Sequence, residues 1–370
     1  MIILLVFPAL YCILLLVSII LWARIPSVGV NTEARNSFSV LIPFRNEEQK
    51  LESLMNSLLG VDYPADQFEV IFINDHSSDG GEAMIESACN NYQNWKIINL
   101  KQQTGKKSAL LKGVQEARYP ILITTDADCN VRPGWLRTYD QAYTRPDTHF
   151  VAGTIELAYE KPTLPVIFQV FEQYALTGLT GVTMHSRYPT MCNGANLSFT
   201  KEAFLAVNGY EGNEQIPSGD DQFLLKKVTS RFHDSAIFMK DPQAAVRTGA
   251  ITEWDEMLHQ RIRWAAKWKS TGGMVSVMAV FIALTYFSLL VSLFFTHQSM
   301  IGEYLPGILL TKLFADALFV AAVAGKRIHA GLYIYWPIIQ VIYPFYTLFV
   351  VWKSIRGNYI WKDRRYSSAV

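Results

Sequence analysis

Cysteine is scarce in this chain of 370 residues, and none of its four cysteines belongs to a CxxC pair. This spacing argues against a zinc site and against a disulfide framework. The thiols fit a reducing compartment. An excess of charge of one sign is missing too, because the net charge is +1, so charge balance gives no sign of a nucleic-acid partner.

Two patterns that bind phosphate groups in α/β proteins are also missing. No GxGxxG follows the first predicted strand, and no GxxxxGK[ST] occurs in the chain. The sequence therefore argues against a dinucleotide-binding fold and against a P-loop fold.

Charged residues are absent from residues 1–23, which are long enough to cross a bilayer, since about 20 residues are needed. A cleaved signal peptide is the alternative. The segment has no basic start, and its exit sequence LWAR has no small-x-small cleavage site. We therefore predict an uncleaved N-terminal transmembrane helix at 1–23.

Three more apolar segments of near-spanning length lie at 274–296, 305–325 and 332–352, within a predicted membrane region at 274–352. In the second of them, Lys312 and Asp316 stand four residues apart. On a helix they share one face and can pair, which makes their burial tolerable.

The charges beside these segments determine only part of the topology. Arg24 and Arg35 follow the first segment, so the positive-inside rule places the central region in the cytoplasm. The basic tail at 353–370 favours the same side. Three full spans would send the tail to the other side, so either one segment is re-entrant or interfacial, or the tail breaks the rule.

Between residues 37 and 270 the pattern changes to alternating strands and helices. We predict strands at 38–43, 68–75, 95–100 and 119–126, and helices at 46–60, 79–92 and 106–118. This alternation implies an α/β domain with a mainly parallel sheet and helices on both faces. Ligands bind outside the carboxyl ends of the strands in such sheets.

Polar residues follow three of these strands and are expected to meet at one edge of the sheet. They are Pro43, Arg45 and Glu47 after the first strand, Asn74, Asp75 and Ser77 after the second, and Asp126 and Asp128 after the fourth. A single cluster of this kind is often only a turn or a helix cap. Three clusters at one edge favour a binding site.

Asp126 and Asp128 bracket one alanine at the end of the fourth strand. Alternate residues of an extended chain point the same way, so both carboxylates are expected to face one ion. Carboxylates so close raise each other's pKa unless a positive charge lies between them, and divalent cations prefer carboxylate oxygens. We predict a divalent cation at this pair, with a turn or capping role as the alternative.

Seven segments between residues 37 and 270 carry a family resemblance by their sequence and their order: LIPFRNEE, VIFINDHSSDG, GKKSALLKG, TTDADC, NGANLSFTKEAF, GDDQFLL and QRIRW. Together they resemble the membrane-bound, processive-type glycosyltransferases of family two, which have the GT-A fold. The resemblance implies a GT-A nucleotide-diphospho-sugar transferase domain flanked by transmembrane helices. It also implies a nucleotide-sugar donor, usually a UDP-sugar.

The resemblance implies a role for each matching residue on the donor side. Asp126 and Asp128 match the DxD motif, which implies that they hold Mg²⁺ or Mn²⁺ against the diphosphate. Asp75 matches the acceptor of the base N–H, although Asn74 stands where a second aspartate is usual and His76 where glycine is common. The remaining donor residues implied are Pro43, Arg45, Glu47 and Lys106.

The resemblance also implies the groups that act on the acceptor. Asp221 matches the general base, and Asp220 replaces the usual glutamate; capping of a helix N-terminus is the alternative. Arg263 is expected to meet the diphosphate and Trp264 the acceptor sugar, on one helix face with Gln260. The remaining acceptor-side residues implied are Gly194 and Asn196.

An interfacial amphipathic helix is the alternative for WDEMLHQRIRWAAKWKS. In either case we expect Arg261 and Lys267 to meet lipid headgroups.

We therefore expect a glycosyltransferase of the hexosyl or N-acetylhexosaminyl type that works by a single inverting displacement. Because the apolar segments are few, we expect a lipid-linked or membrane-proximal glycan acceptor. A small processive polysaccharide synthase is the first alternative. A catalytically silent, nucleotide-binding membrane scaffold is the second.

Overall fold

The computed structural model of the protein describes residues 3–212, 219–266, 272–297, 299–356, 358–361 and 364–367. It divides into two compact units. Unit 1 comprises Met1–Arg24, Tyr159–Val182 and Ala250–Val370, and unit 2 comprises Ile25–Ala158 and Thr183–Gly249. The division differs from the predicted 37–270 domain, because segments 159–182 and 250–266 group with the apolar helices; residue 270 itself lies outside the described residues.

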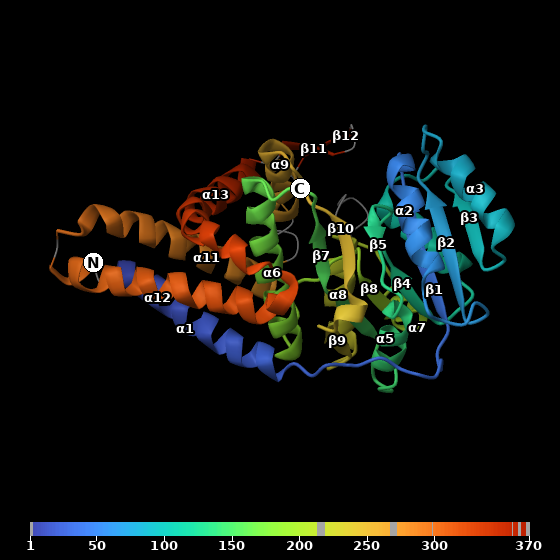
Figure 1. Cartoon of the computed structure of the whole chain (residues 1–370), viewed down its shortest axis with the longest axis horizontal. Helices are drawn as coiled ribbons and strands as arrows, with labels where there is room; N and C mark the ends of the chain where they lie inside the picture. The colour runs from blue at the N-terminus through green and yellow to red at the C-terminus, as the bar shows by residue number, and fades with distance from the viewer. Residues whose placement is uncertain are drawn as a thin grey trace. The chain divides into compact units, whose positions relative to one another are not determined.

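Seven strands form the main sheet of unit 2, in the order β3-β2-β1-β4-β8-β6-β9 (Figure 1). Neighbouring strands are parallel except at β8, which is antiparallel to β4 and β6. The mainly parallel sheet was predicted, but β8 was not. The strands are β1 Phe38–Phe44, β2 Phe68–Asn74, β3 Trp95–Asn99, β4 Ile121–Thr124, β6 Phe150–Gly153, β8 Leu197–Thr200 and β9 Ala236–Met239.

A second, three-stranded sheet in unit 2 has the order β5-β10-β7. Its strands are β5 Cys129–Asn130, β7 Ile155–Ala158 and β10 Val246–Gly249. The β5 strand is antiparallel to β10, which is parallel to β7. This sheet begins directly after the aspartate pair that follows β4.

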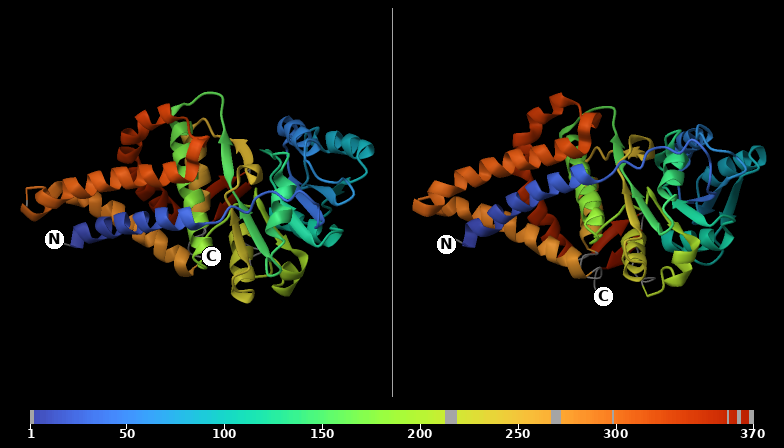
Figure 2. Two further views of the ribbon diagram at one scale, coloured as in Figure 1. Left: turned by 60° about the horizontal axis from the view of Figure 1, so that its bottom comes forward. Right: turned by 90° about the horizontal axis from the view of Figure 1, so that it is seen from below.

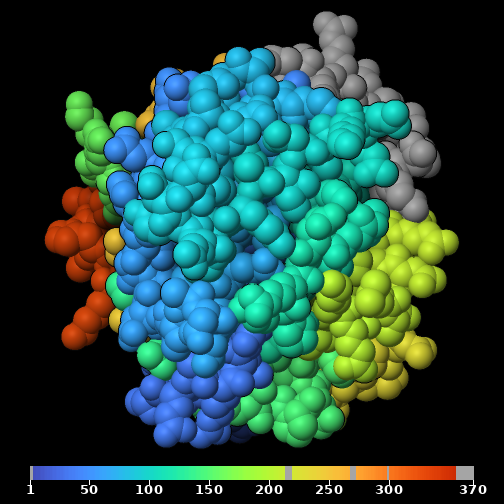
Figure 3. Space-filling view, turned by 90° about the vertical axis from the view of Figure 1, so that its right-hand side faces the viewer, coloured from blue at the N-terminus to red at the C-terminus, as the bar shows by residue number. Residues whose placement is uncertain are grey.

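Helices cover both faces of the main sheet, as the strand sequences require. Side chains alternate between the faces of a strand. Phe38 and Val40 of β1 belong to one core with Leu51 of α2, whereas Leu41 meets α4 on the other face, 3.2 Å from where a Cβ on Gly113 would lie. The surface coloured blue to cyan in Figure 3 belongs largely to this first half of unit 2. The helices of unit 2 are α2 Glu48–Leu59, α3 Gly81–Asn91, α4 Lys106–Glu116, α5 Trp135–Ala142, α7 Lys201–Ala206, α8 Asp220–Arg231 and the 3₁₀ helix η1 Pro242–Ala244.

Two carboxylates fasten the chain that precedes β1 to the rest of unit 2. Asp241 accepts hydrogen bonds from the Ser27 hydroxyl and from the next two backbone N–H groups. Asp140, which is fully buried, accepts from the Asn31 amide at 2.8 Å and from the Asn36 backbone N–H at 2.9 Å. The linker after α1 is therefore an ordered part of unit 2.

Among the described residues of unit 1, four helical segments are long and apolar enough to cross a membrane: Ile3–Arg24, Gly273–Phe295, Met300–Arg327 and Ala330–Ile355. They match the predicted apolar segments, and α1 packs along α11 and α12 (Figure 2). Orientation across a bilayer stays a prediction. The elements are α1 Ile3–Arg24, α6 Leu164–His185, α9 Trp254–Ala265, α11 Gly273–Ser292, α12 Ser299–Ala324, α13 Trp336–Arg356, the 3₁₀ helices η2 Leu293–Phe295, η3 Gly325–Arg327 and η4 Ala330–Tyr335, and the hairpin β11 Asn358–Trp361 with β12 Arg364–Ser367.

A buried polar cluster joins the apolar helices. Lys312 donates to Asp316 at 2.7 Å, as the four-residue spacing predicted, and both side chains are buried. Lys312 also donates to Gln340 at 2.6 Å, and Tyr11 donates to Asp316 at 2.6 Å. Polar groups in an apolar helix bundle must find partners within it, and this cluster satisfies them from α1, α12 and α13.

Candidate active site

Asp126 and Asp128 lie in a turn between two strands. β4 ends at Thr124, and the N–H of Cys129 donates to the Asp126 carbonyl at 3.1 Å to close the turn before β5. The predicted alternation along an extended chain is therefore wrong. Ala127 is buried, whereas the carboxylate side chains are each 36% exposed. The turn thus leaves two acids accessible at the carboxyl end of β4.

Asp128 lies among other charged side chains. Burial, the largest cause, and the charge of Asp126 raise the pKa of Asp128, and Glu47 adds to the increase. Lys50 lowers it from 3.9 Å away, and its ammonium also lies 3.3 Å from Glu47. The sequence analysis missed Lys50, although its place one helical turn after Glu47 was a usable signal.

The residues present fit a divalent cation that is bound partly by protein carboxylates and partly by a substrate phosphate. Within the described ranges, no group of three or more His, Cys, Asp or Glu is arranged to hold a metal ion. Mg²⁺ is nevertheless often bound by only one or two carboxylates together with substrate phosphates, and carboxylate oxygens also suit Mn²⁺. Asp126 and Asp128 offer two such carboxylates, and a cation between them would relieve their repulsion.

Lys106 is the centre of the polar cluster. It stands at the start of α4, and its Nζ lies 2.5 Å from Asp126 and 3.9 Å from Asp220. Burial alone lowers the pKa of Lys106, but Asp126, Asp220 and Asp221 together raise the pKa well above its ordinary value. The ammonium is therefore held charged among three acids that come from the β4–β5 turn and from α8.

Gly194 connects these elements through its backbone. Its N–H donates to Asp221 at 3.1 Å, and its carbonyl accepts from the Thr124 hydroxyl at 2.7 Å. A Cβ at this position would lie 3.2 Å from the Lys106 ammonium and 3.3 Å from an Asp220 oxygen. The structure thus brings Gly194 together with the predicted base and its neighbour.

The first turn of α8 carries Asp220 and Asp221 directly after Gly219. The φ of Gly219 is 84°, a left-handed conformation that glycine adopts without steric cost. Asp221 also accepts a hydrogen bond from the N–H of Gln222 at 2.8 Å. Its carboxylate therefore binds a backbone N–H in the first turn of α8 and at the same time contributes charge to the cluster around Lys106. Tyr210, which the sequence analysis missed, is buried close by. Burial and then the charges of Asp220 and Asp221 raise the pKa of its hydroxyl.

Asn196 does not serve the acceptor, contrary to the prediction. Its side chain is fully buried and makes four hydrogen bonds. The amide nitrogen donates to the carbonyls of Thr154 and Ala244, and the oxygen accepts from Trp135 and Tyr139. With both ends of the amide occupied, Asn196 is a structural residue that joins four segments of unit 2.

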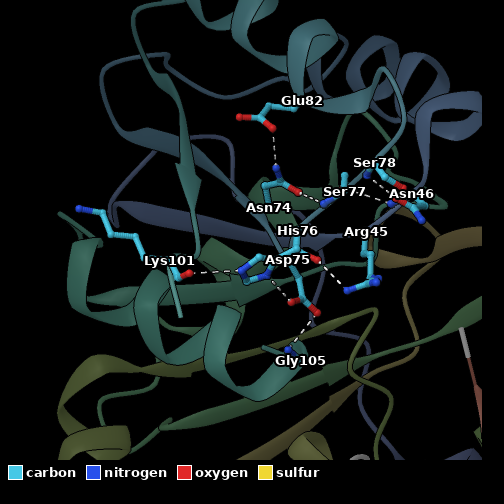
Figure 4. A network of polar contacts seen from close by, with 10 residues as sticks. All are labelled: Arg45, Asn46, Asn74, Asp75, His76, Ser77, Ser78, Glu82, Lys101 and Gly105. Carbon is cyan, nitrogen blue, oxygen red and sulfur yellow. Dashed lines mark hydrogen bonds and ion pairs between the residues drawn. The ribbon is translucent and has the colours of Figure 1, made fainter. Parts of the chain in front are cut away.

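Asp75 is held at the end of β2 by a network of polar contacts (Figure 4). One carboxylate oxygen accepts from the backbone N–H of Gly105 at 2.9 Å, and the other lies 3.2 Å from His76 Nδ1. Arg45 donates to the Asp75 carbonyl at 3.3 Å. Pro43 lies two residues before Arg45 on β1 and is half-buried, so the predicted nucleoside residues share one edge of the sheet.

His76 stands where glycine is common in the family that the sequence resembles. Its backbone conformation is one that favours glycine. Its φ is 59°, in the left-handed region that glycine adopts most readily. Figure 4 shows its ring bridging Asp75 and the carbonyl of Lys101, at 3.2 and 3.5 Å. The ring thus adds contacts that glycine cannot make.

Gln260, Arg263 and Trp264 lie on α9 in unit 1. Their i, i+3, i+4 spacing places them on one face of the helix, and all three are half-buried. Their convergence with the carboxylates of unit 2 stays a prediction.

Arg261 departs from the sequence prediction, because it is buried rather than available to lipid headgroups. It donates to Glu172 at 2.6 Å and is 5% exposed. Burial lowers the pKa of Arg261, but the charge of Glu172, its hydrogen bond and the nearby Tyr346 and Tyr343 together raise the pKa above its ordinary value. Lys267, expected to act with it, lies outside the described residues.

Comparison with known proteins identifies the class. The fold resembles that of the mannosyltransferase PcManGT from Pyrobaculum calidifontis, solved in complex with GDP-Man and Mn²⁺, at a TM-score of 0.60 and 15% identity over 95% of each chain. The protein has the GT-A fold. Residues 39–192 match the family model described as Glycosyl transferase family 2.

Two curated relatives are similar over part of their length. Glycosyltransferase AglE from Haloferax volcanii is 26% identical over 33% of this chain and 40% of its own. A beta-monoglucosyldiacylglycerol synthase from Synechocystis is 24% identical over 61% of this chain and 46% of its own. The chain therefore spans less than half the length of either relative.

Proposed function

We propose that this protein is a metal-dependent inverting glycosyltransferase that moves a sugar from a nucleotide sugar to a hydroxyl of a lipid-linked or membrane-proximal acceptor. The observation that carries the proposal is the gathering of Asp126, Asp220 and Asp221 around the Lys106 ammonium, with Asp128 beside Asp126. These acids can supply both a cation site and a general base, which are the two functions that the proposed metal-dependent inverting transfer uses.

On the donor side, Asp75 accepts the base N–H, and Asp126 and Asp128 would hold Mg²⁺ or Mn²⁺. The ion supplies Lewis-acid stabilisation of the leaving diphosphate when bound. A UDP-sugar is the first choice, as the family resemblance implies, and a GDP-sugar is the second. The other residues of the donor site are Pro43, Arg45, Glu47 and Lys106.

The reaction is one displacement at the anomeric carbon. Asp221 takes the proton of the acceptor hydroxyl as its oxygen attacks. The new carbon–oxygen bond forms while the bond to the phosphate oxygen breaks, and the nucleoside diphosphate leaves with the electron pair. Arg263 and Lys106 counter the charge of the leaving group. A single displacement inverts the anomeric centre and forms no covalent sugar–enzyme intermediate.

On the acceptor side, the family resemblance gives Gly194 a role in unit 2 and gives Gln260 and Trp264 a role in unit 1. A lipid-linked acceptor is supported by one relative, which bears the name of a glucosyldiacylglycerol synthase. The positive charges after α1 favour a catalytic unit that faces the cytoplasm.

The test uses the purified full chain with a panel of UDP- and GDP-sugars and Mn²⁺. Hydrolysis or transfer of at least one donor supports the proposal, and no turnover with no binding overturns it. Mass spectrometry of membranes supplied with labelled donor then separates the products. A labelled glycolipid supports the lipid acceptor, a labelled polymer supports a processive synthase, and nucleotide binding without product supports a silent scaffold.

A further inference from the structure

A buried ion pair in unit 1 lies directly behind the α9 residues assigned to the acceptor. Glu172 of α6 and Arg261 of α9 are 6% and 5% exposed, and Arg261 Nε donates to Glu172 Oε2 at 2.6 Å. The hydroxyl of Tyr346 on α13 donates to the other carboxylate oxygen at 2.7 Å. The pair therefore joins three helices, and both oxygens of Glu172 are occupied.

The rest of the Arg261 guanidinium contacts two residues of the proposed acceptor face. Its Nη1 donates to Gln260 Oε1, and its central carbon lies 4.3 Å from the centroid of the Trp264 ring. A bond to Oε1 turns the Gln260 amide so that its NH₂ group points away from Arg261. A guanidinium over an indole face is a favourable cation–π arrangement that restrains the ring. One guanidinium thus sets the orientation of both side chains.

Only an arginine makes this set of contacts. Its planar group offers donors on separate edges and a face that stacks, whereas a lysine ammonium is a point charge without a face. Stability alone does not call for a charged pair here, because well-packed apolar residues often replace a buried ion pair without loss. The geometry of the group is therefore better explained by what it orients.

We propose that Glu172 and Arg261 are positioning residues: their buried ion pair holds Gln260 and Trp264 in the orientation in which these two side chains meet the sugar acceptor. The inference rests on the proposed function and extends it to two residues that do not touch substrate. Glu172 fixes Arg261, and Arg261 fixes the two side chains.

The test compares two matched double substitutions of buried ion pairs in unit 1. Glu172→Leu with Arg261→Met replaces the positioning pair by apolar residues, so it removes the orientation without leaving a lone buried charge. Lys312→Met with Asp316→Leu replaces the buried pair in α12 in the same way. Each double variant also removes the carboxylate that accepts a tyrosine hydroxyl, from Tyr346 in the first and from Tyr11 in the second. Arg261→Lys retains a charge for Glu172 but loses the stacking face.

We expect the Glu172–Arg261 double variant to fold and to hydrolyse donor in the absence of acceptor within about twofold of wild type. Its kcat/KM for the acceptor should fall about tenfold to a hundredfold, the size of effect that misplacing a reactant by about 1 Å produces. Arg261→Lys should show a similar loss. The α12 double variant should keep the wild-type acceptor kinetics.

Three results would overturn the inference. A folded Glu172–Arg261 double variant with wild-type acceptor kinetics removes the positioning role. An equal loss in the α12 control makes the effect a general disturbance of the helices. A parallel fall in donor hydrolysis and in transfer places the defect outside the acceptor face. Failure of the proposed function is seen separately, as a wild-type protein that turns over no donor, and it would end both proposals.

Discussion

The cluster around Lys106 in unit 2 and the cluster around Lys312 in unit 1 each combine a lysine with carboxylates, and they differ in charge balance and in exposure. In unit 2, Lys106 faces three acids, and the side chain of Asp126 is 36% exposed. In unit 1, Lys312 and Asp316 are matched one to one, are 5% and 7% exposed, and have further partners in Gln340 and Tyr11. The Lys106 cluster has more carboxylates than ammonium groups and is accessible to solvent, whereas in the Lys312 cluster the two charges balance and both side chains are buried.

This difference separates a site from a structural contact. Surplus carboxylates that are open to solvent gain by binding a cation, since the cation removes their mutual repulsion. A buried, balanced pair has no such gain to make, and the loss of one of its two partners is felt in stability. The presence of ionisable residues in an apolar helix is thus not enough to indicate function when their partners are all in place.

The largest expected effect is on the proposed base. Asp221→Asn should lower transfer by about 10²–10⁴-fold, because the acceptor hydroxyl loses its proton acceptor. Binding of the nucleotide should be retained. Steady-state transfer and calorimetric titration with UDP measure the two quantities.

Glu202→Gln is the matched control, because Glu202 is an exposed acid in the first turn of α7. It should leave transfer near wild type. If Asp221→Asn lost nucleotide binding and transfer to the same extent, Asp221 would be a cap rather than a base.

The balanced pair in unit 1 should respond in stability. Asp316→Leu leaves the Lys312 ammonium buried without its carboxylate, so unfolding in mixed micelles should require about 3–5 kcal/mol less free energy than for wild type. The double substitution Lys312→Met with Asp316→Leu should recover most of that loss. A single variant as stable as wild type would show that water or lipid reaches the cluster.

Cation binding at the surplus cluster should depend on pH. A carboxylate must be deprotonated to bind metal, and the pKa of Asp128 is raised. Mn²⁺ affinity measured with UDP should therefore fall by up to about tenfold per pH unit below that raised value, starting at a higher pH than an ordinary aspartate would give. Because Lys50 lowers the pKa of Asp128, Lys50→Met should move the fall to still higher pH. An unchanged profile would remove Asp128 from the metal site.

The smallest expected effect is on the stability of the metal-free protein. An aspartate whose folded-state pKa is raised destabilises the folded state wherever it is ionised, and this penalty fades as pH falls below the raised pKa. Asp128→Asn should then raise the unfolding midpoint in EDTA at pH 7.5 by about 1–3 °C, while it abolishes the stabilisation by Mn²⁺. A lower midpoint in EDTA would contradict the surplus of negative charge.

The first half of unit 2 was predictable because its strands and helices have clear periodicity. β1, β2 and β3 and the helices between them lie within two residues of their predicted bounds. The aspartate pair was also found, but not its geometry, since an extended strand end and a tight turn have the same local sequence signal. The antiparallel β8 was missed because pairing direction depends on distant chain rather than on local pattern.

Individual side chains were less predictable than elements. Asn196 lies in a segment that resembles an acceptor site, and only the positions of Trp135, Tyr139 and two carbonyls show that its amide is fully used. Arg261 reads as an interfacial basic residue until Glu172, 89 positions earlier, is seen beside it. In both cases the deciding partner is far away in sequence.

The two carboxylates that fasten the chain before β1 also set an order in time. During synthesis, the partner of Asn31, Asp140, is made 109 residues later, and the partner of Ser27, Asp241, is made 214 residues later. At about 5–20 residues per second, the ribosome needs roughly 10–40 s to supply that second partner. The contact between Ser27 and Asp241 therefore forms only after most of unit 2 has been synthesised, so the linker is among the last parts of that unit to reach its final packing.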